Sequence, residues 1–271
     1  MPLDSEYSSR RRSVEEVRVK LPDAATQEEL LEIYFAYVHP ALPVLHKQSF
    51  LEELRNGCVV YLPIFPVMCQ SSSSRSRHVA HGSSNEFDSP SPLQFGRSRP
   101  HISPLLLLAM FSVAARYTST HDNDRPPSES TMWPAGDAYL AEAKRLLDSS
   151  YASSRSATCQ ALLLMGYREI GIGAMAQAWL YVGMAIRMAQ DLGMHKNADQ
   201  WTHDGTSLFT SVELQERRRI WYTCVIMDKY VSSYMGRPLS ISEREFDTEL
   251  PSIDEVCILF SCQLCLPLTP A

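Results

Sequence analysis

Apolar side chains recur every three or four residues along most of the chain, and this spacing predicts amphipathic helices. Between residues 22 and 35 the apolar positions follow this spacing behind Asp23, which suits an N-cap. A shorter helix is expected from Ser49 to Gly57, where glycine would end it. No segment alternates between apolar and polar residues for long enough to build a sheet. The pattern therefore predicts an all-α, multi-helix fold.

The strongest helical patterns lie in the second half of the chain. Ser103 and Pro104 form a favourable start for one helix, because proline suits the first helical position. Two further helices are expected to form a hairpin joined at residues 171–173, and the second is nearly free of charge, which predicts a central helix buried all round. The four helices expected here lie within residues 103–117, 136–150, 156–173 and 174–195, and Gly193 is expected to end the last of them.

A fifth helix, expected over residues 212–235, raises the question of nucleic-acid binding because its first turns hold three consecutive arginines. After Arg219 the sequence becomes apolar, whereas a recognition helix keeps a polar face long enough to span a groove of DNA. The pattern favours a core helix with charged first turns over a DNA-reading helix. Asp228 lies among apolar neighbours and is expected to need a partner. The predicted core stripe consists of Ile220, Cys224, Met227, Val231 and Tyr234, widened by Trp221, Val225 and Ile226.

Composition weakens the case for direct DNA binding further. Of the 271 residues, 45% are hydrophobic and 21% are charged, which allows a sizeable core. The 31 carboxylates exceed the 25 Lys and Arg residues, and the isoelectric point is near 5.8. A domain that binds phosphates usually carries a basic face. With no secretory signal, no long apolar run and seven irregularly spaced cysteines, we expect an intracellular protein without a membrane span.

No arrangement of residues typical of catalysis or metal binding stands out. Asp122 and Asp124 are a candidate magnesium site for an α-helical enzyme, but they lie in a proline-cut loop without the usual spacing. Cys262 and Cys265 form a CxxC pair without the second pair that zinc requires. We therefore predict no catalytic, cofactor-binding or metal-binding residues and no enzyme activity.

Two motif-bearing segments, together with the helices between them, resemble the fungal-specific transcription factor domain. This is the middle homology region of fungal regulators that carry a binuclear zinc cluster. The first segment, Tyr34–Leu54, resembles the opening motif of the family, and the second, residues 213–252, resembles its arginine–tryptophan, aspartate and Gly-Arg-Pro positions. The matching positions are His39, Pro40, Pro43, His46, Phe50, Arg217, Arg218, Arg219, Trp221, Asp228, Gly236, Arg237 and Pro238.

The resemblance implies a nuclear, all-helical regulatory domain that modulates transcription by RNA polymerase II. It implies that the domain acts through helical contacts with transcriptional regulators or by sensing a small molecule, and that it can form homo- or heterodimers. DNA and zinc would be bound by a six-cysteine cluster N-terminal to this region, and no Cys-x2-Cys-x6-Cys pattern occurs here. The alternative is a free-standing helical scaffold or inhibitor that sequesters related regulators without binding DNA.

The same resemblance divides the chain into segments. Residues 1–21 are expected to be a flexible charged tail, and residues 22–255 the N-terminal part of the regulatory domain, incomplete at its C-terminus. Residues 71–100 are rich in Ser, Pro, Arg and Gly and are expected to be a disordered insertion. Residues 256–271 carry no charged side chain, and Val256-Cys257 can be encoded by a common intron start. We expect this last segment to be intron read-through.

Overall fold

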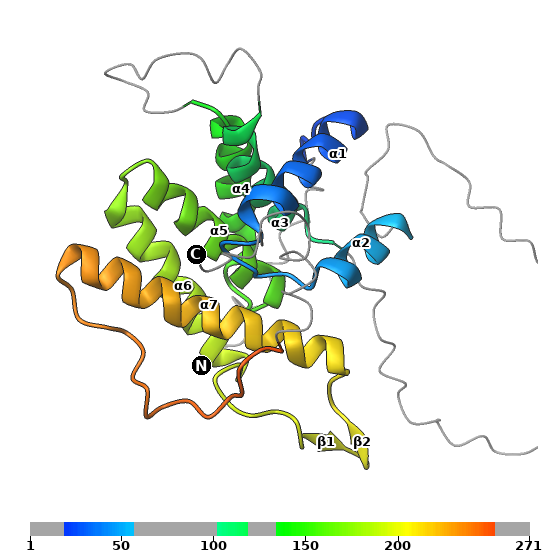
Figure 1. The fold of residues 1–271 in the computed structure, drawn as a ribbon, viewed down its shortest axis with the longest axis vertical. Helices are drawn as coiled ribbons and strands as arrows, with labels where there is room; N and C mark the ends of the chain where they lie inside the picture. Colours follow the sequence, from blue (N-terminus) through cyan, green and yellow to red (C-terminus); the bar gives the residue numbers. More distant parts are fainter. Residues whose placement is uncertain (1–18, 57–101, 119–133, 253–271) are drawn as a thin grey trace, which may run out of the picture.

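The computed structural model describes residues 19–56, 102–118 and 134–252, and in these ranges it is mostly helical (Figure 1). This confirms the predicted all-α fold. Two antiparallel strands of two residues each, β1 Thr202–His203 and β2 Thr206–Ser207, precede α7 Ser211–Met235. No helix within these ranges combines the length and apolarity needed to cross a bilayer. The elements are α1 Ala24–Ile33, the π-helical turn η1 Tyr34–Val38, α2 Lys47–Arg55, α3 Pro104–Ala114, the 3-10 turn η2 Ala115–Tyr117, α4 Asp137–Ser150, α5 Ser156–Gly171, α6 Met175–Asp191, β1 Thr202–His203, β2 Thr206–Ser207 and α7 Ser211–Met235.

Helix α3 lies at the centre of the molecule. Every residue after Pro104 is buried, and the helix packs against α1, α4 and α5. Pro104 stands at the first helical position, as predicted. A helix that is apolar on all sides needs neighbours on all sides, and α5 supplies one of them with its long buried stretch from Thr158 to Gly166. The core therefore forms around α3 and α5.

The predicted hairpin of α5 and α6 is present, but the second helix is not buried all round. Gly173 (φ 82°) and Gly193 (φ 67°) adopt the left-handed backbone that ends the two helices. Helix α6 packs one side against α5 and α7, while Leu180 on the opposite side is 58% exposed. The prediction was wrong because a lack of charge does not require burial: apolar atoms make up much of a protein surface.

Helix α7 crosses α5 and α6 and is the longest of the described helices (Figure 1, yellow to orange). A capping box between Thr210 and Glu213 starts it one residue before the predicted position, and Gly236 (φ 64°) ends it. Most of the predicted stripe is buried, but Tyr234 is 71% exposed and Ile226 is 62% exposed. The buried part of the stripe therefore ends at Val231, one turn before the helix does.

Helix α2 begins at Lys47, two residues earlier than predicted. The Ser49 backbone N–H donates to Nδ1 of His46 at 3.2 Å, so His46 is the N-cap. Histidine is not among the usual capping residues, which explains why the sequence pattern placed the start at Ser49.

Candidate functional site

The first group of motif residues forms the turn that joins η1 to α2. His39 is 4% exposed and its ring lies 5.3 Å from that of Phe35. His46 caps α2, and the Phe50 ring lies 5.7 Å from the same Phe35 ring. Pro40 is exposed and Pro43 is half-buried, and both lie where the chain reverses. These residues fix how α2 sits against α1 and η1.

His39 is neutral at physiological pH. Burial is the main cause that lowers its pKa from 6.5 to about 4, and the positive charges of Arg219 and Lys47 contribute to the same shift. Its Nδ1 has no hydrogen-bond partner in the part of the chain that the structure describes. His46, Phe50 and Glu216 of α7 line one cavity, so the two motif segments, far apart in sequence, lie close together in space.

The three arginines in the second and third turns of α7 are largely covered by other parts of the chain. Arg217 donates to the Leu192 carbonyl at 2.9 Å, and its guanidinium lies 4.3 Å from the centre of the Phe209 ring. Arg218 donates to both oxygens of the Asp199 carboxylate at 2.6 Å, and its side chain is 13% exposed. Arg219 is 4% exposed. The core-helix interpretation is thereby confirmed, since the structure leaves little of these cations for a phosphate backbone.

Asp228 has the partner that the sequence analysis expected. Its Oδ2 accepts hydrogen bonds from the backbone N–H groups of Ser240 (2.8 Å) and Ile241 (2.9 Å). Both donors belong to the chain segment that follows the Gly-Arg-Pro motif. A buried carboxylate that accepts backbone N–H bonds is well satisfied, and it holds this segment against α7.

The remaining motif residues fasten the same segment. The Arg237 guanidinium lies 4.2 Å from the centre of the Trp179 ring on α6, a cation–π contact. Trp221 is 1% exposed, and its ring lies 5.6 Å from the rings of both His195 and Phe246. His195 thus packs against the core. The second group of motif residues thus holds the segment that follows α7, residues 236–252, against α6 and α7. We call this segment the return loop and the contacts that hold it the clamp.

A small polar cavity of about 190 Å³ lies beside His46, where α2, α3, α5 and α7 meet. Gln160 on α5 donates to the Val44 carbonyl and to the Glu216 carboxylate. Burial raises the pKa of Glu216 and that of Glu53. The sequence analysis missed this cavity, although a glutamine at the start of an apolar helix was a usable signal.

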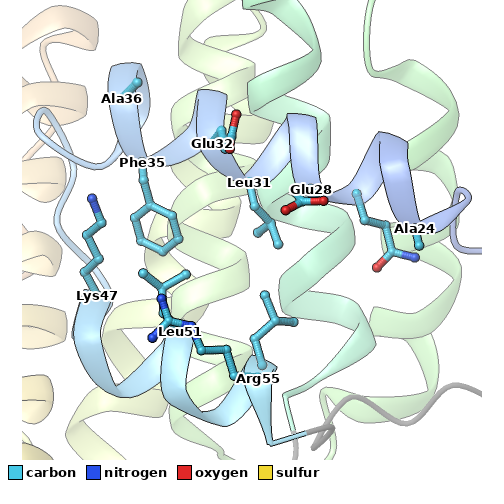
Figure 2. Close-up of a pocket in the computed structure, with 11 residues that line it drawn as sticks. Ala24, Glu28, Leu31, Glu32, Phe35, Ala36, Lys47, Leu51 and Arg55 are labelled. Carbon is cyan, nitrogen blue, oxygen red and sulfur yellow. The ribbon is translucent and has the colours of Figure 1, made fainter.

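A larger groove lies between α1–η1 and α2, with a volume of about 630 Å³ (Figure 2). Leu31 and Phe35 point from the upper helix toward Leu51 of α2. The volume is within the range of small-molecule sites, although this groove is open along its length. The lining consists of Ala24, Gln27, Glu28, Leu31, Glu32, Phe35, Ala36, Lys47, Leu51, Leu54 and Arg55.

None of the thirteen matching positions lines the groove, although Phe35 and four other lining residues fall within the Tyr34–Leu54 segment. The turn from His39 to His46 connects the two walls of the groove. The sequence analysis missed the groove because a groove depends on how two helices are placed, which helical periodicity does not determine. The motif residues position this site rather than form its surface.

The described ranges contain no group of three or more His, Cys, Asp or Glu residues placed to hold a metal ion. Several residues and segments singled out from the sequence lie outside these ranges. They are Asp122, Asp124, Cys262 and Cys265, together with most of the 1–21 tail, the 71–100 insertion and the 256–271 tail.

Comparison with known proteins gives one family. The family model described as "Fungal specific transcription factor domain" matches residues 31–256. An uncharacterised transcriptional regulatory protein of Schizosaccharomyces pombe is 35% identical over 161 residues, which are 58% of this chain and 24% of that protein. A nitrogen assimilation transcription factor of Neurospora crassa is 38% identical over 52% of this chain and 12% of its own length.

A third relative matches over more of the chain. A Zn(2)-C6 fungal-type transcription factor of Fusarium oxysporum is 27% identical over 85% of this chain and 18% of its own length. The chain therefore spans at most 24% of each of these relatives. No solved structure matches it.

Proposed function

Because the chain belongs to the fungal specific transcription factor domain family, we propose that it acts as the regulatory domain of a fungal transcription regulator. The family is one of transcription factor domains and not of enzymes. In this role the helical body modulates transcription by RNA polymerase II through its surface, by contacting other regulators or a small-molecule effector. The protein acts in the nucleus, and a separate cysteine cluster binds DNA and zinc.

The observation that supports this role best is that the three consecutive arginines of α7 contact other parts of the chain. A protein that binds DNA through α7 would need free cations there to neutralise phosphates. Arg217 and Arg218 instead bond to Leu192 and Asp199, and Arg219 is buried. The net charge of −6 points the same way. Helix α7 therefore stabilises a helical domain whose surface is available to partner proteins or small-molecule effectors.

A tethered reporter assay tests the proposal. The chain is placed between a heterologous DNA-binding domain and a heterologous activation domain, and reporter output is compared with a flexible linker of equal length. We expect output to change about fivefold or more, the lower end of ordinary allosteric coupling. Trp221→Ala, which removes a core side chain, should return output to the linker level, whereas the exposed substitution Leu180→Lys should not.

Output equal to that of the linker would overturn the proposal. The same reporter also separates the two modes of action considered from the sequence. A regulatory domain acts only when tethered in the fusion. A free-standing inhibitor acts when the chain is expressed separately beside a full-length relative.

A further inference from the structure

The groove between α1 and α2 has the form of the surface that two neighbouring helices present to a third helix packed against both. Leu31 and Phe35 are spaced i, i+4 along one wall, and Leu51 and Leu54 are spaced i, i+3 along the other. Leu31 and Phe35 are nearly buried, 6% and 5% exposed, while the two α2 leucines are half-buried. Apolar rows at this spacing on two neighbouring helices make the kind of surface into which an amphipathic helix packs.

The length of the groove indicates an elongated occupant. Its lining on α1 and η1 runs from Ala24 to Ala36. At 1.5 Å per residue this wall is about 18 Å long, or roughly three turns of helix. The residues that line this volume of about 630 Å³ come from the whole of that wall and from α2 between Lys47 and Arg55.

The charges on the two edges of the groove are opposite. Glu28 and Glu32 are exposed along the α1 edge, and Lys47 and Arg55 line the α2 edge. The Lys47 ammonium lies 5.2 Å from the centre of the Phe35 ring, at one end of the floor. An occupant with charge of a single sign would leave one edge unmatched or repelled, whereas a helix can carry both signs on opposite edges.

We propose that this groove binds an amphipathic helix of a partner protein, about three turns long. The helix buries an apolar stripe against Leu31, Phe35, Leu51 and Leu54. It places basic residues along the edge that faces α1 and acidic residues along the edge that faces α2. This rests on the proposed regulatory function and gives that function its partner chemistry.

A designed peptide of this pattern tests the proposal on the purified full chain. The probe is a fluorescent helical peptide with leucines at helical spacing, lysines on one edge and glutamates on the other. Its binding is measured by anisotropy. Glu28→Lys with Glu32→Lys should weaken binding about fivefold, since two exposed ion pairs are lost. The exposed Glu29, which does not line the groove, provides the control Glu29→Lys, which should leave the affinity unchanged.

A peptide with glutamates on both edges should bind the Glu28→Lys, Glu32→Lys variant, whose two groove edges are both basic, more tightly than it binds the unaltered chain. Leu51→Lys, which places a charge on the floor of the groove, should abolish binding, with Leu180→Lys as its matched surface control. Circular dichroism confirms that each variant is folded. A variant that is merely destabilised would bind every peptide less tightly, so it would not prefer a peptide that the unaltered chain binds poorly.

Several outcomes would overturn the proposal: no peptide binding, or equal losses in the Glu29→Lys and groove variants. Binding of laurate but not of the peptide would make the groove a small-molecule site. A chain that is a dimer, and that becomes a monomer in Leu51→Lys, would mean that a second copy of the chain occupies the groove. Reporter activity without peptide binding would overturn only the proposal for the groove. Peptide binding without reporter activity would overturn the proposed function.

Discussion

At the scale of single residues, the buried imidazole of His39 makes stability depend on pH. Its pKa is lowered from 6.5 to about 4 in the folded chain, so the folded state favours neutral histidine. This contribution is fully present above pH 6.5 and is lost as the pH falls toward 4. A shift of this size corresponds to about 3 kcal/mol, at about 1.4 kcal/mol per pKa unit.

His39→Gln should therefore lower the acid sensitivity of folding. We expect the difference in unfolding free energy between pH 7 and pH 4, from urea titrations, to shrink by up to about 3 kcal/mol in the variant. His203, with a side chain 81% exposed, provides the control His203→Gln, which should leave that difference unchanged. An unchanged pH dependence in His39→Gln would contradict the account of this residue.

Asp228 gives a second prediction at this scale. Asp228→Ala would leave the backbone N–H groups of Ser240 and Ile241 without their acceptor, at a cost of about 2–4 kcal/mol. The amides of both residues should also exchange faster with deuterium. Glu243, whose carboxylate bonds to the exposed Lys229, provides the control Glu243→Ala, which should leave the urea midpoint unchanged. Equal effects of the two substitutions would argue against the clamp.

The sequence could predict the need of Asp228 for a partner but not the partner itself. A carboxylate among apolar neighbours on one helix is visible from periodicity alone. The donors belong to a loop twelve and thirteen residues further along, and their position depends on how that loop folds back. The acceptor of Arg218, Asp199, is likewise nineteen residues away and depends on how the chain folds between them.

At the scale of elements, two glycines with positive φ should respond differently to alanine. Gly236 ends α7 at φ 64°, and a Cβ at this position would meet only open space, so Gly236→Ala should cost about 1 kcal/mol of backbone strain. Gly136 starts α4 at φ 81°, and a Cβ there would lie 2.3 Å from the Ser112 carbonyl oxygen of α3. Gly136→Ala must separate α3 from α4 and should cost about 3 kcal/mol or more.

Urea unfolding of the two variants provides the measurement. A similar loss for both would mean that the close approach of α3 to α4 at Gly136 is not needed for stability. A loss in Gly236→Ala larger than that in Gly136→Ala would contradict the packing described for these helices.

The elements were predicted best where local signals determine them. Pro104, Gly173 and Gly193 mark helix ends through backbone geometry that the residue type alone reveals. The burial of α6 was misjudged because burial depends on which neighbours a helix has, not on its composition. The start of α2 was misjudged because His46 caps a helix that the sequence pattern placed later.

At the scale of the whole molecule, the two motif segments meet across the fold. The positive charge of Arg219 on α7 lowers the pKa of His39, which lies about 180 residues earlier in the chain. One segment positions the walls of the groove and the other closes the return loop. Helical periodicity predicts the elements that carry these segments, but their meeting is a tertiary property that periodicity does not contain.

We propose that the arginine-rich helix α7 is part of the helical body of a regulatory domain and does not read DNA. Anisotropy of a labelled duplex titrated with the full chain at physiological salt tests it most directly. We expect no saturable binding up to about 10 µM, and the same curve for Arg218→Ala. Saturable binding that depends on DNA sequence and is lost in Arg218→Ala would contradict the account.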